Sequence, residues 1–209
     1  MHDDLESDAR LIHASLADPQ LFRALFERHF AAIYGYFARR LGRAAADDLT
    51  AEVFLRAFER RADYDPGYAD ARPWLFGIAA NLLRRSRRTE ERRLRALARQ
   101  PAEVSDMGDE GVAGDARLDD EATRPVLARA LASLRADERE VLLLIAWADL
   151  SYEEVARALA IPVGTVRSRL HRARAHMRSV LEREYPSDPK DPTPETAVVK
   201  EDVRWMTSS

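Results

Sequence analysis

The stretch from Ile161 to Arg178, IPVGTVRSRLHRARAHMR, sets arginines between small and apolar residues in a helical rhythm. An arginine side chain can donate two hydrogen bonds to O6 and N7 of a guanine. Hydroxyl groups and backbone N–H groups near the start of a helix bind phosphate. These residue types and spacings therefore predict recognition of a nucleic acid rather than the making or breaking of bonds.

A helix-turn-helix is predicted around this stretch. Ser151, followed three residues later by Glu154, is a capping box that starts a short helix. The run from Ala160 to Pro162 breaks that helix, and a second helix opens beyond it with an apolar stripe at spacings of three and four. The opposite face is expected to contact DNA through Gly164, Thr165, Arg167, Ser168, Arg169, His171, Arg172 and Arg174. The alternative is a solvated basic face on an ordinary bundle helix, because arginine is also a good helix former.

The formal net charge of −3 hides a strong segregation of charge along the chain. Residues 84–99 hold eight arginines against two glutamates, and residues 101–123 hold eight acidic residues against one arginine. The basic block favours a polyanionic partner. The acidic stretch contains three glycines and few bulky apolar residues, so it is predicted to be a flexible, self-repelling linker.

The helical signals predict an all-α fold of two small domains. Asp18 and Pro19 form a helix start, Gly42 ends that helix, and Pro73 opens a later one. The first helix is expected to place four apolar residues on one face: Phe22, Phe26, Ile33 and Phe37. A second helix is predicted over about residues 45–61. The expected organisation is a domain at 1–100, a linker at 101–123, a helix-turn-helix domain at 124–185 and a disordered polar tail at 186–209.

Several classes of protein are disfavoured by what the sequence lacks. It has no cysteine, which excludes a disulfide framework and cysteine-based metal or redox chemistry. It has no apolar run near the ~20 residues that cross a bilayer and no apolar signal core, so a cytoplasmic protein without a membrane span is expected. Its five histidines are scattered, and no hydrolase or phosphate-loop motif occurs. We therefore expect no enzyme, no metal site and no cofactor.

Taken together, the stretches resemble the sigma-70 family of bacterial RNA polymerase sigma factors, in its extracytoplasmic-function (ECF) group. The helix-turn-helix segment 151–181 and the preceding 131–150 look like region 4 of that family. Segments 22–42, 45–58 and 72–88 look like regions 2.1, 2.2 and 2.3–2.4, in the family's order. The resemblance implies a promoter-specificity subunit that binds core polymerase through the β′ clamp helices and the β flap. An anti-sigma protein is a further possible partner.

The resemblance also implies roles for individual residues. Contact with the clamp helices is carried over to Asp47, Asp48, Leu49, Glu52, Phe54 and Leu55. Opening of the −10 promoter element and capture of an unstacked base are carried over to Tyr64, Trp74, Asn81, Arg84, Arg85 and Arg88. Aromatic faces and cations suit single-stranded DNA, although the spacing of Trp74 with Ile78 and Leu82 also suits a core position. The arginine-rich face that begins at Gly164 would read the −35 element.

Two departures from the family pattern bear on the structure. Ala160 stands where glycine is frequent, which is strained if its φ is positive. Leu134-Arg135 stands where Leu-Pro is common, which predicts that the preceding helix runs further. The competing hypothesis is a free-standing helix-turn-helix regulator that binds operators as a dimer. A regulator binds duplex DNA tightly by itself, whereas a sigma factor needs core polymerase.

Overall fold

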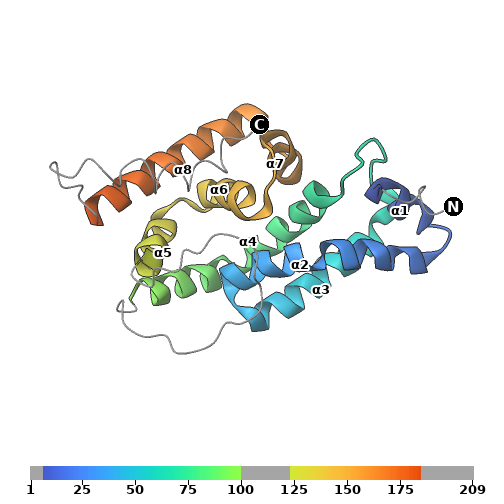
Figure 1. Ribbon diagram of the computed structural model, residues 1–209, viewed down its shortest axis with the longest axis horizontal. Coiled ribbons are helices and arrows are strands. Elements are labelled where there is room, and N and C mark those ends of the chain that lie inside the picture. Colours follow the sequence, from blue (N-terminus) through green and yellow to red (C-terminus); the bar gives the residue numbers. More distant parts are fainter. Residues whose placement is uncertain (1–6, 100–122, 185–209) are drawn as a thin grey trace. The chain divides into compact units, whose positions relative to one another are not determined.

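The computed structural model describes residues 7–99 and 123–184, and every regular element within those ranges is a helix (Figure 1). This confirms the predicted all-α fold. The predicted tail and the predicted linker, apart from Thr123, lie outside the described residues. The described chain divides into two compact units, of which one holds residues 7–93 and 150–166. The other unit holds residues 94–99, 123–149 and 167–184.

The first helix, α1 (Asp8–Ala14), was not anticipated from the acidic and polar start of the chain. Ser7 caps it, because its side chain accepts a hydrogen bond from the N–H of Arg10. Leu11 and Ile12 are almost fully buried, so this short helix is held by its apolar side. The predicted start at Asp18 is confirmed as the cap of a 3-10 turn, η2 (Pro19–Leu21).

Helix α2 (Phe22–Leu41) packs along α3 (Arg43–Glu59), as Figure 1 shows. Gly42 ends α2 as predicted, with a φ of 94° that favours glycine. The predicted inner face of α2 was wrong in one position, because Phe26 is 37% exposed. The core register runs instead through Phe22, Leu25, His29, Ile33, Tyr36 and Phe37.

Helix α4 (Arg72–Ala98) follows the 3-10 turn η3 (Arg61–Asp63) and a loop. It joins α2 through an edge-to-face contact between the rings of Tyr36 and Phe76, whose centroids are 5.3 Å apart. It also carries Glu90, whose Oε1 accepts a hydrogen bond from Arg40 Nε at 2.6 Å. Both side chains of this ion pair are at least 96% buried, with exposures of 2% and 4%. The charges are therefore compensated inside the bundle.

The remaining helices are α5 (Thr123–Ser133), α6 (Ala136–Ala148), α7 (Tyr152–Leu159) and α8 (Val163–Glu184). The expectation that the helix continues through Leu134-Arg135 was wrong. Arg135 adopts φ −60° and ψ 143°, the extended conformation that proline also adopts, and α6 begins after it. Among the described helices, none combines the length and the apolar character needed to cross a membrane.

Replacing Glu90 by Gln should lower the free energy of unfolding by about 3 kcal/mol, because it leaves the buried Arg40 charge uncompensated. Urea unfolding would be followed by Trp74 fluorescence in the full chain, with the other two tryptophans changed to Phe in every variant. The control is Glu27→Gln, which breaks the exposed i,i+4 pair with Arg23 and should cost less than about 0.5 kcal/mol. Equal losses for the two variants would contradict the account of this pair.

Candidate nucleic-acid interface

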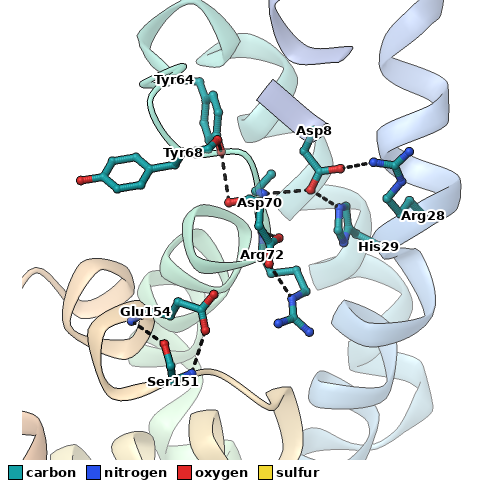
Figure 2. A network of polar contacts seen from close by, with 10 residues as sticks. Asp8, Arg28, His29, Tyr64, Tyr68, Asp70, Arg72, Ser151 and Glu154 are labelled. Carbon is teal, nitrogen blue, oxygen red and sulfur yellow. Dashed lines mark hydrogen bonds and ion pairs between the residues drawn. The ribbon is translucent and has the colours of Figure 1, made fainter. Parts of the chain in front are cut away.

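The predicted capping box at the start of α7 is confirmed. Ser151 Oγ accepts a hydrogen bond from the N–H of Glu154 at 3.3 Å, and Glu154 Oε2 accepts one from the N–H of Ser151 at 2.7 Å (Figure 2). Val155 and Ala156 supply the buried side of this helix. The first helix of the motif is therefore fixed at its N-terminus by its own side chains.

The turn between α7 and α8 contains a strained residue. Ala160 has φ 53° and ψ 47°, in the left-handed region that residues with a Cβ occupy at a cost. Because this φ is positive, alanine is strained at a position where glycine is frequent in the family. Beyond the turn, the carbonyl oxygen of Pro162 accepts hydrogen bonds from the N–H groups of Thr165 and Val166, at 2.9 and 3.2 Å. This arrangement starts α8.

Most of the predicted DNA-reading residues lie opposite the buried Val166, Leu170 and Ala173, but the Nε and Nη2 atoms of Arg174 are buried. The exposed members of the set are Gly164, Arg167, Ser168, His171 and Arg172, whereas Thr165, Arg169 and Arg174 are half-buried. A Cβ added to Gly164 would meet no atom within 4 Å. The fold itself thus leaves room at this position for the close approach of a partner.

Two of these arginines are held by acids in the first turn of α6, which the sequence analysis missed. Arg172 Nε donates to Glu138 Oε1 at 2.7 Å, and Glu138 is only 9% exposed at its side chain. Arg169 Nε lies 3.1 Å from Asp137 Oδ2. The acids occupy one edge of each guanidinium and leave other N–H groups for a further acceptor. Sequence separation of more than thirty residues concealed these pairs.

The residues of α4 that the family resemblance assigns to the −10 element include one asparagine and three arginines. Asn81, Arg84, Arg85 and Arg88 are all exposed. Their spacings of three, four and seven residues place them on one helical face. The opposite side of α4 buries Leu75, Phe76, Ile78, Ala79, Leu82 and Leu83. This face therefore offers cations to a polyanion without burying them.

The loop of residues 64–71, here named the aromatic loop, leads into α4. Tyr64 was predicted to face DNA, yet it is 9% exposed and its ring packs on Trp74 with centroids 5.0 Å apart. Burial, together with the negative charges of Asp8 and Asp70, raises the pKa of Tyr64 to about 12. Tyr68, in contrast, is 44% exposed and points away from the buried contacts (Figure 2). Tyr68 is thus the more exposed tyrosine of this loop, and the guanidinium of Arg157 lies over one face of its ring, with Cζ 4.2 Å from the ring centroid.

A buried carboxylate, Asp8, joins α1 to α2 and to the aromatic loop. Asp8 Oδ1 accepts from Arg28 Nη1 at 2.6 Å, and Oδ2 lies 2.8 Å from His29 Nε2 (Figure 2). Burial raises the pKa of Asp8, but the hydrogen bonds from His29, the Ala71 N–H and Arg28 outweigh that effect and lower it overall. The carboxylate is therefore held as an anion.

Asp8, His29 and Asp70 bring potential metal-ligand atoms within 4.8 Å of one another. Both oxygens of Asp8 already accept hydrogen bonds, and both oxygens of Asp70 accept from Arg72, at 2.8 and 3.1 Å. The carboxylate oxygens therefore accept hydrogen bonds from N–H groups of the protein. The cluster is thus a structural anchor, which neither the spacing of the residues nor their types indicated.

The acidic and apolar face of α3 contains most of the residues predicted to contact the clamp. Asp47, Asp48 and Leu55 are exposed, Leu49 and Glu52 are half-buried, and Phe54 is buried. Next to it on α2 runs an aromatic row that the sequence analysis missed, made of Phe26, Phe30 and Tyr34. Phe26 packs on Phe54 with ring centroids 4.8 Å apart, which joins the row to α3. Together they form an exposed apolar patch edged by carboxylates.

Comparison with known proteins identifies the family. Residues 25–93 match the family model of sigma-70 region 2, and residues 125–177 match that of sigma-70, region 4. The ECF RNA polymerase sigma factor SigL of Mycobacterium tuberculosis is 31% identical over 175 residues, covering 83% of this chain and 96% of that protein. The chain belongs to the ECF group of sigma-70 factors. Sigma factors are transcription initiation factors that bind RNA polymerase and are not themselves enzymes.

Further relatives agree with the assignment of this chain to the ECF group. SigK of Mycolicibacterium vanbaalenii is 30% identical over 177 residues, covering 84% of this chain and 89% of that protein. The structure of CnrH in complex with the cytosolic domain of CnrY matches with a TM-score of 0.58 at 23% identity, covering 85% of this chain and 98% of that one. The structure of the sigma factor RpoE in complex with the anti-sigma factor NepR, from Bartonella quintana, matches with a TM-score of 0.54 at 23% identity. The match covers 77% of this chain and 96% of that one. These structures share the fold.

Replacing Ala160 by Gly should stabilise the helix-turn-helix by about 1 kcal/mol, because glycine adopts the left-handed conformation without a Cβ clash. The melting temperature would be read from Trp147 fluorescence in the full chain. The matched control is Asp149→Gly, at a φ of 51°, where the gain should be smaller because aspartate tolerates this region. A lower melting temperature for Ala160→Gly would contradict the assigned strain.

Proposed function

We propose that this ECF sigma factor directs transcription by reading the −35 element with α8 and by melting the −10 element with the aromatic loop and α4. The observation that carries the proposal is the presence of two exposed cationic helix faces on separate stretches of one chain. A helix-turn-helix regulator needs only the face on α8. The face on α4 lies next to an aromatic loop, a combination that suits unpaired DNA.

In this proposal the chain keeps the domain organisation that the sequence predicts. Residues 1–100 bind core polymerase and the −10 element, residues 124–185 bind the −35 element and the β flap, and residues 101–123 span them. Tyr68 takes the stacking role first given to Tyr64, because its ring is the more exposed of the two. Trp74 supports the loop through its contact with Tyr64.

The apolar patch on α2 and α3 is the proposed contact for the β′ clamp helices. Leu55 is 52% exposed, and Phe26 and Phe30 are 37% and 38% exposed, which leaves apolar area for a partner to bury. The carboxylates of Asp47 and Asp48 at its edge favour a basic partner surface. An anti-sigma protein that competes for core polymerase would use the same patch.

Replacing Asp48 by Arg should abolish capture of the chain by purified bacterial core RNA polymerase in a pull-down, because it sets a cation against a basic surface. The matched control is Asp63→Arg, which makes the same charge reversal at an exposed residue of η3, away from the α3 face. The control should bind as the unaltered chain does. Loss of binding in both variants, or in neither, would contradict the assigned contact.

Replacing Arg172 by Ala should lower selection of the preferred −35 bases by roughly 10- to 100-fold, the effect of losing one two-bond contact with a base. The measurement is transcription by the reconstituted holoenzyme from templates randomised in the −35 window, followed by sequencing of the transcripts.

The control for Arg172→Ala is Glu138→Gln, which breaks the same ion pair but keeps the guanidinium on α8. If Glu138→Gln removes −35 selection to the same extent, the arginine acts by stabilising the domain and its proposed base contact is wrong. Binding of core polymerase should be unchanged in both variants.

A further inference from the structure

Helix α1 lies before the residues that match the region 2 family model, and no step of the proposed function uses it. Its first residue nevertheless reaches the far end of the aromatic loop. Asp8, which is 4% exposed, accepts a hydrogen bond from the N–H of Ala71 at 2.9 Å. The N–H of Ala9 also donates to the carbonyl of Ala69, with the nitrogen 3.4 Å from the oxygen. Helix α1 thus binds the last residues of the loop.

Tyr64, the first residue of the loop, contacts the backbone of later residues in the same loop. Its hydroxyl lies 2.7 Å from the carbonyl oxygen of Tyr68 and 3.1 Å from that of Asp70, to which it can donate (Figure 2). Between these points Asp65 accepts from the N–H of Gly67 at 2.9 Å and closes a turn. The backbone that carries Tyr68 is therefore held by hydrogen bonds on both sides, while Tyr68 as a whole residue is 44% exposed.

We propose that Asp8 and Tyr64 are positioning residues that hold the aromatic loop in the conformation that captures the unpaired −10 base. This inference rests on the proposed function, since it concerns the same loop. A loop ordered before binding loses less conformational entropy when it engages a ligand. Arg28 and His29 contribute by fixing the Asp8 carboxylate from α2.

The Tyr64→Phe variant separates positioning from stacking. Phenylalanine keeps the aromatic ring and its packing on Trp74, and it removes only the hydroxyl that binds the two carbonyls. A base-stacking role for Tyr64 predicts no change in −10 selection, whereas the positioning role predicts a loss of about tenfold. Templates randomised in both the −10 and the −35 windows, transcribed by the holoenzyme, report the two selections in one experiment.

The Asp8→Asn variant tests the contact from α1. An amide cannot accept from the Ala71 N–H on one side and from Arg28 on the other, because one of its two ends is a donor. Faster hydrogen exchange at the Ala71 amide and a loss of about tenfold in −10 selection are expected. Selection at −35 and binding of core polymerase should stay as they are in the unaltered chain.

The control for a merely structural effect is Glu90→Gln, which breaks the buried ion pair that joins α4 to Arg40 of α2. It should keep −10 selection even where its stability falls as far as that of Asp8→Asn. If Asp8→Asn and Tyr64→Phe both select −10 bases as the unaltered chain does, the inference is overturned and the proposed function stands. If the unaltered holoenzyme itself selects no −10 bases, the proposed function fails and this inference with it.

Discussion

The long helices α4 and α8 each have to bury one side and keep a row of arginines in water on the other. Burying an unpaired guanidinium is costly, so the apolar positions of each helix decide which way its cations face. On α4 the buried leucines and alanines leave Arg84, Arg85 and Arg88 exposed. On α8 the same division leaves Arg167 and Arg172 exposed. The proposed DNA contacts depend on this division.

Acidic residues in the fold restrain these surfaces. Glu138 and Asp137 hold two arginines of α8, and Asp8 holds the end of the aromatic loop. An ion pair within the chain reduces the freedom of a long side chain and fixes one edge of its guanidinium. The chain therefore carries charge partners of its own near the places where DNA is proposed to bind. Preorganisation of this kind lowers the entropy lost on binding.

The features that the sequence predicted correctly are local ones. The capping box at Ser151 and the end of α2 at Gly42 each follow from residues a few positions apart. The family could also be recognised from motifs in their order. The inner face of α2 was harder to predict, because Phe26 fits the same periodicity as the buried residues yet is 37% exposed, with its ring packed on Phe54 of α3.

The features that the sequence did not predict join distant segments. Asp8 binds groups that are 20, 21 and 63 residues away, and Glu138 binds an arginine 34 residues away. Rules based on helical or strand periodicity do not predict pairs so far apart in the sequence. The interior position of Tyr64 has the same origin, because its burial comes from Trp74 and from the fold of the loop. The residue type of Tyr64 alone suggested stacking on DNA. Its packing on Trp74 and its hydrogen bonds to the loop backbone instead indicate a role in supporting the loop.

The most direct test of the account is permanganate footprinting of a promoter that the reconstituted holoenzyme transcribes. Permanganate modifies unpaired thymines, so it detects melting without any assumption about which residue contacts which base. The account predicts reactive thymines in the −10 window when this chain and core polymerase are both present, and none with either alone. A duplex bound tightly by the chain alone, with no reactive thymines when core polymerase is added, would contradict it and favour a free-standing regulator.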